Sequence, residues 1–367
     1  MITICLCMIV KNEEDSIARC LESVKDLVEE INIIDTGSSD TTKDIVAKYT
    51  DRIFDFEWID DFSKARNYAF QQATKDYIFW LDADDILLEV DRKKFKKLKE
   101  TLDPSIDTVT MDYHLSVDQY GNVTSRVKRN RLVKRENQFQ WIGMVHEYLE
   151  VWGNILNSDI AVTHKSKRHD VDRNLLIYER QLAQGKDFTP RDLFYFANEL
   201  KDHQMYERAI YYYEKFLKTK MGWIEDNIST CSKLADCYFE LGDFEKEIES
   251  ILRSFQFDSP RPEFCCRLGF YFFQKKEFLT SVFWYKLATQ MEVPKDNWGF
   301  INPTFSTWLP HLQLCVCYDQ LGEHELAYHH NEVALQYRPK DPSVLHNKAY
   351  LESLLQKKEA KGTPHGE

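Results

Sequence analysis

The chain has 367 residues, of which 43% are hydrophobic, so it has enough apolar material for a packed core and wholesale disorder is excluded. Its 60 acidic and 48 basic residues give a net charge of −12. Nucleic acids and anionic membranes bind basic surfaces, so this composition argues against a general binder of either. The length corresponds to two or three domains, at about 100–200 residues for each domain.

Several features favour a reducing compartment and no membrane span. No apolar run approaches the roughly 18 residues that a spanning helix needs. The apolar residues 1–10 follow no basic segment, so they are typical of a buried strand rather than of a signal peptide. The nine cysteines are odd in number and scattered, which favours free, mostly buried thiols. We therefore expect a cytoplasmic protein.

Up to about residue 165, short apolar runs alternate with helical patterns. The predicted strands are residues 2–10, 30–35, 52–58 and 77–81, and the predicted helices are residues 13–26, 41–49 and 62–73. This alternation predicts a Rossmann-like α/β domain over residues 1–168, with a mostly parallel sheet and helices on both faces. Ligands bind such sheets outside the carboxyl ends of the strands. The polar residues at Asp35, 60–67 and 82–85 are therefore expected at one edge.

After about residue 170, paired helices replace the strands. Similar helix patterns begin at Tyr206, Phe244, Phe278 and His324, with spacings of 38, 34 and 46 residues. A period near 34 with paired helices resembles tetratricopeptide repeats, whose units stack into a solenoid because none buries its apolar face alone. We expect an all-α repeat domain over residues 169–358, a capping helix over residues 341–357 and a disordered tail over residues 359–367.

The predicted strand 77–81 runs directly into Asp82, Asp84 and Asp85. Carboxylates crowded at a strand end repel one another unless a cation binds there. Hard oxygen ligands suit Mg²⁺ or Mn²⁺, and such an ion can bridge the phosphates of a nucleotide. The alternative is a solvated loop in which Asp84 or Asp85 caps a helix that begins near residue 86.

Three further motifs accompany this Asp-x-Asp pair, namely Lys11-Asn12-Glu13-Glu14, residues 35–40 and residues 62–67. Their order resembles the nucleotide-binding half of the inverting family 2 glycosyltransferases, which have the GT-A fold. The resemblance implies a nucleotide sugar as donor, and it implies Asp84 as a metal ligand. The residues that it places at the nucleotide are Val10, Asn12, Glu13, Asp35, Arg66, Asn67, Leu81, Asp82 and Ala83.

The chemistry of these side chains agrees with those roles. The Asp35 carboxylate can accept the imide N–H of uracil, which favours a UDP-sugar. The Arg66 guanidinium can neutralise a diphosphate with a two-pronged hydrogen bond. A divalent ion stabilises the nucleoside diphosphate as negative charge develops on it. The alternative for Arg66 is the solvated face of an amphipathic helix.

A second motif, Trp141-Ile142-Gly143-Met144-Val145-His146-Glu147, follows the basic segment 131–135. It resembles a branch of the same family that carries tetratricopeptide repeats and includes the sublancin-type S-glycosyltransferases of bacteriocin peptides. An inverting transfer needs a base on the acceptor, and Glu147 is the expected base. His146 is its expected partner, either as a further metal ligand or as a group that orients the acceptor. Trp141 either stacks on a sugar or packs in the core.

His164 is the candidate for a third metal ligand, because imidazole suits Mn²⁺. The branch often has a glycine within two residues of this histidine, whereas residues 166–169 here contain none. The alternative for His146 and for His164 is a hydrogen-bonded structural residue. Residues 126–135 hold six basic side chains, which form either a solvated face or a flank of the site for a diphosphate or an acidic acceptor.

Taken together, these patterns predict metal-dependent, inverting transfer of a hexose from a UDP-sugar to a peptide or protein acceptor. The ion is Mn²⁺ or Mg²⁺, which the ligands alone do not distinguish. The repeats present the acceptor or mediate a homodimer, which an exposed aromatic patch favours. Two alternatives stay open, namely a transferase that builds cell-surface polysaccharide or lipid-linked sugar, and a non-catalytic repeat scaffold.

Overall fold

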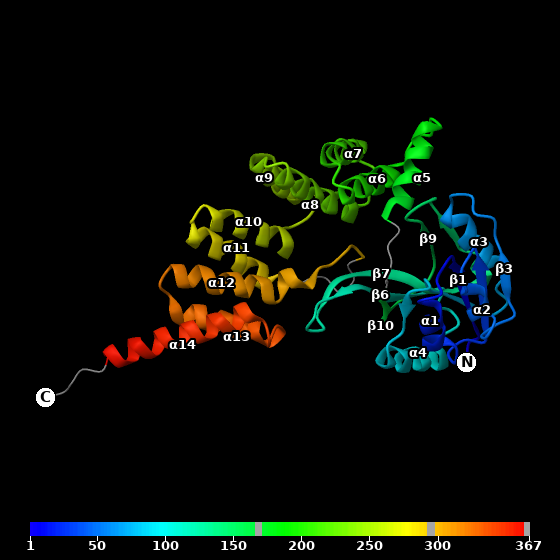
Figure 1. The fold of residues 1–367 in the computed structure, drawn as a ribbon, viewed down its shortest axis with the longest axis horizontal. Coiled ribbons are helices and arrows are strands. Elements are labelled where there is room, and N and C mark those ends of the chain that lie inside the picture. The colour runs from blue at the N-terminus through cyan, green and yellow to red at the C-terminus, as the bar shows by residue number, and fades with distance from the viewer. Residues whose placement is uncertain (166–170, 292–297, 363–367) are drawn as a thin grey trace. The chain divides into compact units, whose positions relative to one another are not determined.

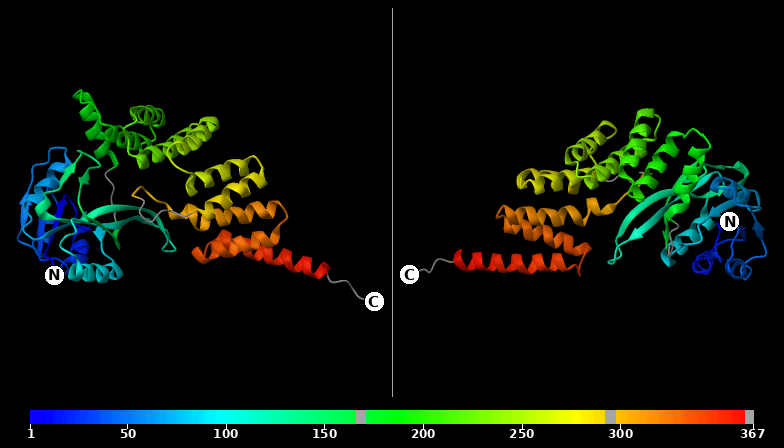
Figure 2. Two further views of the ribbon diagram at one scale, coloured as in Figure 1. Left: turned by 180° about the vertical axis from the view of Figure 1, so that it is seen from behind. Right: turned by 45° about the horizontal axis from the view of Figure 1, so that its top comes forward.

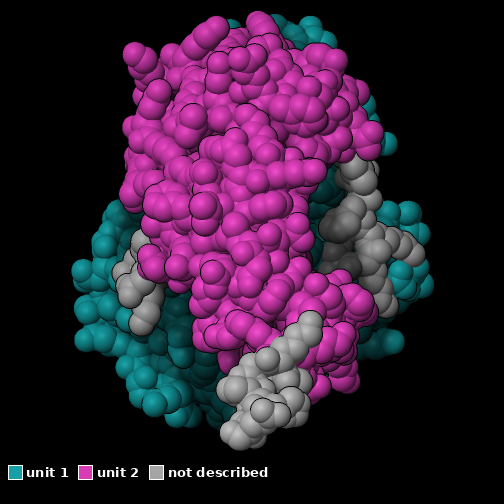
Figure 3. Space-filling model, turned by 90° about the vertical axis from the view of Figure 1, so that its left-hand side faces the viewer, with its two compact units in different colours: residues 1–115, 126–200 teal, residues 116–125, 201–367 magenta. Residues whose placement is uncertain are grey.

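The computed structural model describes residues 1–165, 171–291 and 298–362 (Figure 1). The chain forms two compact units, which Figure 3 distinguishes by colour. Unit 1 comprises residues 1–115 and 126–200, and unit 2 comprises residues 116–125 and 201–367. The first unit thus extends beyond residue 168, where the sequence analysis ended the α/β domain. Residues 166–169, which lack the glycine expected shortly after His164, lie outside the described residues.

Unit 1 is built on an eight-stranded sheet with the order β3-β2-β1-β4-β7-β6-β10-β5. The strands of its first half are β1 (Ile4–Val10), β2 (Glu30–Asp35), β3 (Ile53–Asp55) and β4 (Tyr77–Trp80). These four strands are parallel, as predicted, and Val10 pairs with Asp35 at the carboxyl ends of β1 and β2. The helices between them are α1 (Ile17–Val24), α2 (Thr42–Val46) and α3 (Phe62–Gln71).

Alternation along β1 explains how both faces of the sheet are covered. Ile4 and Leu6 pack in one core with α1 and with α4 (Glu89–Thr101). Cys5 and Cys7 point to the other face, where they pack with Ala69 of α3. Because both faces are buried, β1 is apolar throughout, as a central parallel strand must be. All nine cysteines of the chain are buried and free, which confirms the expected thiols.

The second half of the sheet was not predicted as strands, because its runs are polar. It contains β5 (Asp85–Ile86), β6 (Thr108–Val117), β7 (Val123–Lys134) and β10 (Ile155–His164). β7 is antiparallel to β4, and β5 is antiparallel to β10, so the sheet is mixed. A separate hairpin of β8 (Gln140–Ile142) and β9 (Tyr148–Glu150) follows a short 3₁₀ turn, Arg135–Asn137. Two helices complete the unit, α5 (Val171–Ala183) and α6 (Pro190–Asp202), the latter ending at its boundary.

Unit 2 is a stack of paired helices (Figures 1 and 2). They are α7 (Tyr206–Thr219), α8 (Ile224–Glu240), α9 (Phe244–Arg253), α10 (Pro262–Gln274), α11 (Phe278–Gln290), α12 (Trp308–Gln320), α13 (His324–Tyr337) and α14 (Pro342–Gly362). Short 3₁₀ turns span Ser254–Gln256 and Pro303–Ser306. The four repeat positions found in the sequence, Tyr206, Phe244, Phe278 and His324, each begin a helix, so the tetratricopeptide-like architecture is confirmed.

The last helix, α14, continues to Gly362, past residue 357 where the sequence analysis ended it. Residues 363–367, the remainder of the predicted tail, lie outside the described residues. Among the described helices, none combines the length and the apolar character needed to cross a membrane.

Candidate functional site

The carboxyl ends of β1 and β2 carry two loops that are joined by hydrogen bonds. Asn12, which has a left-handed backbone with φ of 55°, accepts the Ser39 N–H on its Oδ1 at 2.8 Å. The Val10 carbonyl accepts the Thr36 N–H at 3.0 Å. The loop that follows β1 is therefore held against the loop that follows β2. Val10 and Asn12 lie at the edge of the sheet where the resemblance places the nucleotide.

Asp35 ends β2 and is almost completely buried. Its Oδ1 accepts the backbone N–H groups of Gly37 and Ser38, both at 2.9 Å. Its Oδ2 is buried and has no hydrogen-bond partner within the described parts of the chain. A buried carboxylate oxygen without a donor is unfavourable, so a ligand that supplies an N–H there would be stabilised.

Glu13, in the loop after β1, lies near the acidic segment that follows β4. Burial raises the pKa of Glu13, the hydrogen bond from Ser16 opposes that rise, and the charges of Asp84, Asp82 and Asp40 add to it. Its carboxylate therefore lies within electrostatic range of both aspartates of the Asp-x-Asp pair. The predicted convergence of these loops at one sheet edge is thus reflected in their mutual electrostatics.

Helix α3 carries Arg66 and Asn67. The Asp61 side chain caps the helix by accepting the Lys64 N–H at 3.1 Å. The Asn67 amide pairs with the backbone of Trp141, donating to its carbonyl at 3.0 Å and accepting its N–H at 2.8 Å. Asn67 therefore fixes β8 against α3. Trp141 is buried in the core of that face, which agrees with the packing alternative for this residue.

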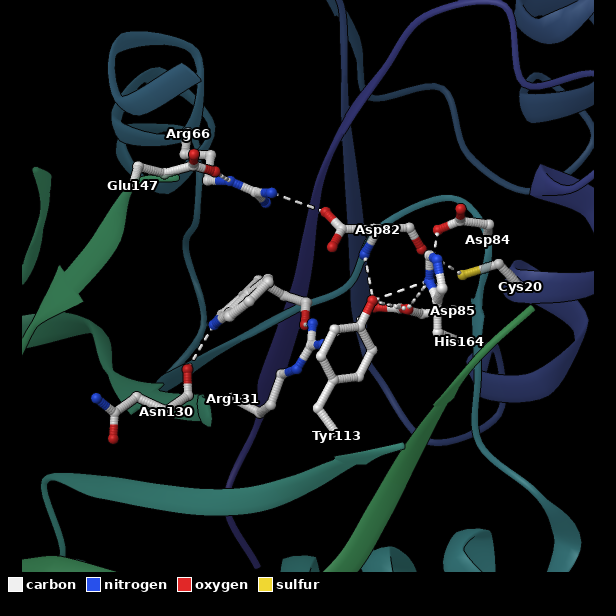
Figure 4. A network of polar contacts seen from close by, with 11 residues as sticks. Cys20, Arg66, Asp82, Asp84, Asp85, Tyr113, Asn130, Arg131, Glu147 and His164 are labelled. Atoms are coloured by element: carbon white, nitrogen blue, oxygen red, sulfur yellow. Dashed lines mark hydrogen bonds and ion pairs between the residues drawn. The ribbon is translucent and has the colours of Figure 1, made fainter. Parts of the chain in front are cut away.

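Arg66 bridges two carboxylates. Its Nη2 donates to Asp82 Oδ1 at 2.7 Å and its Nε donates to Glu147 Oε1 at 2.5 Å (Figure 4). The guanidinium also lies over the rings of Trp80 and Trp141, with centroid distances of 5.0 and 4.8 Å. Burial alone would lower the pKa of Arg66, but the two carboxylates outweigh it and raise that pKa. Arg66 is thus a fixed cation within the site and does not lie on a solvated helix face.

The loop between β8 and β9 sets the position of Glu147. Gly143 and His146 both have left-handed backbones, with φ of 100° and 52°, and the first of these requires glycine. The Met144 carbonyl accepts the Phe62 N–H at 2.8 Å, which ties the loop to the start of α3. Two anchors on α3 therefore hold the loop, and Glu147 faces Arg66 as a result.

A second cluster joins three potential metal ligands, Asp84, Asp85 and His164. Their ligand atoms all lie within 4.8 Å of one another, and the three side chains point toward a common centre in Figure 4. His164 Nδ1 lies 3.4 Å from an oxygen of each aspartate, and these hydrogen bonds raise the pKa of His164 to about 10. Two carboxylates and one imidazole form a donor set that suits Mn²⁺ and is compatible with Mg²⁺.

Sequence reasoning missed the residues that support this cluster. The Tyr113 hydroxyl donates to Asp85 Oδ1 at 2.8 Å and lies 2.9 Å from His164 Nδ1. The fully buried Arg131 pairs with Asp85 Oδ2 at 3.1 Å and stacks on the rings of Trp80 and Tyr113. Asp85 was predicted as one of the crowded carboxylates or as a helix cap, but not as a named metal ligand. Tyr113, Arg131 and Asp85 lie on β6, β7 and β5, respectively. Strand β5 pairs with β10, and this pairing places His164 opposite Asp85.

His146 lies elsewhere in the site. Its Nε2 is 2.7 Å from Glu199 Oε1 on α6, and its ring stacks on Tyr195 with centroids 4.3 Å apart. Arg191 donates to the His146 carbonyl at 2.8 Å. The three-ligand cluster found among the described residues does not include His146. Of the two roles left open for it, its contacts favour orientation of a neighbouring group over metal binding.

Leu81 and Ala83 flank Asp82 and are buried in the core beneath it. Any contact that they make with a ligand would therefore involve their backbone groups. Burial opposes the ionisation of Asp82, but the charges of Arg66 and Arg131 hold its pKa below the ordinary value. Asp82 is about one-third exposed, so its carboxylate is the accessible acidic group between the two clusters.

Comparisons with known proteins identify a matching family and several relatives. The family model described as "Glycosyl transferase family 2" matches residues 5–154. The SPbeta prophage-derived glycosyltransferase SunS of Bacillus subtilis is 31% identical over 228 residues, covering 58% of this chain and 53% of that protein. The TPR repeat-containing protein Synpcc7942_0270 of Synechococcus elongatus is 47% identical over 88 residues, covering 24% of this chain and 22% of that protein.

A third relative is the lipopolysaccharide core biosynthesis glycosyltransferase LpsC of Rhizobium meliloti. It is 28% identical over 158 residues, which cover 41% of this chain and 58% of that protein. The chain therefore spans less than two thirds of the length of each of these relatives.

Proposed function

We propose that this chain, whose residues 5–154 belong to glycosyl transferase family 2, transfers a hexose from a UDP-sugar to a peptide or protein acceptor with inversion. The observation that carries the proposal is the placement of Asp82. It lies between the Asp84–Asp85–His164 cluster and the Arg66–Glu147 pair. A cation-binding end and a base are thus linked through one accessible carboxylate.

Each end of this arrangement has a distinct task. Asp84, Asp85 and His164 would hold Mn²⁺ or Mg²⁺, which supplies charge stabilisation to a departing nucleoside diphosphate. Asp82 binds the ribose, with the backbone of Leu81 and Ala83 beside it. The free Oδ2 of Asp35 accepts the imide N–H of uracil, a group that cytosine lacks, which is why we favour UDP over CDP.

Glu147 accepts the proton of the acceptor as the acceptor attacks the sugar. Arg66 holds Glu147 in place and supplies positive charge beside Asp82. His146, fixed by Glu199 and Tyr195, orients the acceptor next to Glu147. Asn67 acts through Trp141, whose backbone it holds, rather than by direct contact with the nucleotide.

The repeats of unit 2 would present the acceptor and form a homodimer. Large apolar side chains are exposed on α7, α9 and α11, among them Tyr211, Phe244 and Leu279. Such side chains favour association with a partner surface. The nine free thiols favour a reducing compartment, so we propose a cytoplasmic location. Sedimentation of the full chain tests the dimer.

The first experiment is thermal unfolding with UDP, GDP or dTDP, each with Mn²⁺, with Mg²⁺ and with EDTA. A ligand at 100 times its dissociation constant adds about 2.7 kcal/mol, which moves the midpoint of the domain that it binds by several degrees. We expect an ion-dependent shift with UDP that Asp84→Asn abolishes. No shift with any nucleotide would favour the scaffold alternative and contradict the proposal.

A second candidate acceptor class is a lipid-linked or cell-surface glycan, which the likeness to LpsC favours. The two classes separate in one assay. UDP-hexose turnover is compared with a random peptide pool and with a lipid-linked saccharide as acceptor. Label in the peptide fraction supports the primary proposal, and label only in the lipid fraction supports the second.

A further inference from the structure

Arg191, in the first turn of α6, contacts both chain neighbours of Glu147. Its Nε and Nη2 donate to the His146 carbonyl at 3.2 and 2.8 Å. Its guanidinium also lies over the ring of Tyr148, 4.8 Å from the centroid. One side chain therefore holds the residue before Glu147 and the residue after it.

A whole face of α6 is directed at the same loop. Arg191, Tyr195 and Glu199 are spaced by four residues, so they lie on one face of the helix. The Tyr195 ring lies 4.7 Å from the Arg191 guanidinium and 4.3 Å from the His146 ring. The Glu199 carboxylate lies 2.7 Å from His146 Nε2. All three side chains thus contact His146, which directly precedes the proposed base.

Aromatic packing makes α6 a firm support for these contacts. Phe196 of α6 packs against Tyr178 of α5 and against Phe188, with ring centroids 5.5 and 5.4 Å apart. Arg173 of α5 lies 4.7 Å over the ring of Phe62, the residue that begins α3. Helices α5 and α6 are therefore joined to the helix that supplies the other contact of the base.

The geometry of the loop explains why a contact at the His146 carbonyl matters. His146 has a left-handed backbone, which is unfavourable for a residue with a Cβ, so other contacts must compensate. The His146 carbonyl and the Glu147 N–H belong to one planar peptide group, so a hydrogen bond to the carbonyl fixes the orientation of both. The loop is also tight, since a Cβ at Gly143 would lie 3.5 Å from Glu147 Cα. Arg191 therefore sets the direction in which Glu147 leaves the backbone.

We propose that Arg191 is a positioning residue for the acceptor base Glu147, and that α5 and α6 are thereby part of the catalytic machinery. This inference rests on the proposed function. In the transfer the acceptor oxygen attacks the sugar carbon, its proton passes to the Glu147 carboxylate, and the electron pair of the broken bond stays on the phosphate oxygen. Arg66 holds that carboxylate (Figure 4), and Arg191 orients the peptide group from which the side chain extends.

The experiment compares Arg191→Met, which keeps the length but removes the donors, with the wild-type full chain. The probes are a UDP-hexose with Mn²⁺ and a serine peptide and its cysteine counterpart, and water replaces the serine peptide if only the cysteine peptide is accepted. We expect kcat on the serine peptide to fall about 10–100-fold, because a misplaced base transfers the proton poorly. Transfer to the cysteine peptide should fall less than about threefold, since a thiol ionises readily. UDP affinity, measured by calorimetry, should stay within about twofold.

The matched control is Arg180→Gln, which removes an exposed arginine of α5 that pairs with Asp60. It should leave both rates unchanged. A second test places Arg191→Met in the Glu147→Gln background. We expect no further loss on the serine peptide there, because two substitutions that act through one group are not additive. A purely structural role for Arg191 would instead add its full loss.

The outcomes separate this inference from the function on which it rests. If the wild-type chain transfers sugar to none of these acceptors, the proposed function fails and the role of Arg191 fails with it. If the wild type is active but Arg191→Met lowers both transfers equally, or adds its full loss to Glu147→Gln, only the positioning role is overturned. Arg191→Lys keeps the charge without the two-pronged geometry and is judged by the same criteria, so the test stands even if Arg191→Met does not fold.

Discussion

Arg66 Nε lies 2.5 Å from Glu147 Oε1, so an arginine in the middle of α3 is bonded to the carboxylate that we propose as the acceptor base. The same guanidinium holds Asp82 through its Nη2. A cation placed between two carboxylates removes the repulsion that they would otherwise exert on each other. It also fixes Glu147 at a set distance from the acidic end of the site.

Glu147→Gln should affect hydroxyl and thiol acceptors differently. A thiol has a pKa near 8.5 and ionises without much help, whereas a serine hydroxyl needs a base in the transition state. We expect the substitution to lower transfer to a serine peptide by about 10²–10⁴-fold and to lower transfer to the matched cysteine peptide far less. The measurement is kcat/KM on the two peptides.

The matched control is Glu150→Gln, which removes an exposed carboxylate at the end of β9 and should leave both rates unchanged. Equal losses on the two peptides for Glu147→Gln would contradict a role as base. They would point instead to a loss of the Arg66 contact, which both reactions share.

The sequence predicted the first half of the sheet well, because its signals are local. Strand β2 was predicted with its observed bounds, since Ile31, Ile33 and Ile34 form a β-branched segment that ends at a turn-rich segment. The helix face of Ile17, Leu21 and Val24 was also predicted, from spacing alone. Strands β6, β7 and β10 were missed because their exposed ends are polar. In addition, β7 carries five basic side chains, which hide a period of two.

The site was predicted in part for the same reason. The motifs after β1, β2 and β4 each begin at the carboxyl end of a strand. Parallel pairing of these strands therefore brings the motifs together. Asp85, Tyr113 and Arg131 belong to a cluster formed by antiparallel and long-range pairing, and no local pattern announces such partners. The contact of His146 with Glu199 joins residues 53 positions apart on a loop and a helix, and spacing gives no sign of it.

Asp85→Asn should destabilise unit 1 strongly. Asp85 and Arg131 form a fully buried ion pair at 3.1 Å, and the substitution leaves the arginine charged, buried and without a full counter-charge. Breaking such a pair from one side costs about 3–5 kcal/mol of unfolding free energy. Urea denaturation of the full chain, followed by a probe in unit 1, measures this loss.

The control for that experiment is Asp112→Asn, which breaks the partly exposed pairs with Arg126 and Lys128 on the same strand. It should lower the unfolding free energy by less than about 1 kcal/mol. A loss of similar size for both aspartates would show that burial of the Arg131 pair adds no stability of its own.

The stability of unit 2 should fall between about pH 6.5 and pH 4 because of His330. Its Nδ1 lies 2.9 Å from His311 Nδ1, and burial, together with neighbouring His311 and His329, lowers the pKa of His330 to about 4. The unfolded chain then binds a proton near pH 6.5 that the folded chain does not bind until about pH 4. The unfolding free energy therefore decreases as the pH falls through this window, and His330 adds no pH dependence above it.

His330→Gln should flatten this part of the profile by on the order of 1 kcal/mol or more, as measured by denaturation at several pH values. The exposed His346 on α14 provides the control, because His346→Gln should keep the wild-type slope. A wild-type slope in His330→Gln would contradict the depressed pKa.

Asp35→Asn should change which nucleobase the protein prefers. Asparagine has one carboxamide oxygen, which is needed by the N–H groups of Gly37 and Ser38. Its NH₂ group then takes the place of the unpartnered Oδ2, so a donor faces the imide N–H of uracil. We expect UMP and UDP to weaken by the same factor, about 10–100-fold, because the contact involves the base and not the phosphates.

The same substitution should favour cytosine, whose N3 is an acceptor and matches the new NH₂ group. The ratio of UMP to CMP affinity, measured by calorimetry, therefore falls in Asp35→Asn. It stays at the wild-type value in Asp55→Asn, which changes an exposed aspartate on β3 whose carboxylate pairs with Lys43. An unchanged ratio in Asp35→Asn would mean that Asp35 does not contact the base, and that its buried oxygen holds only the loop after β2.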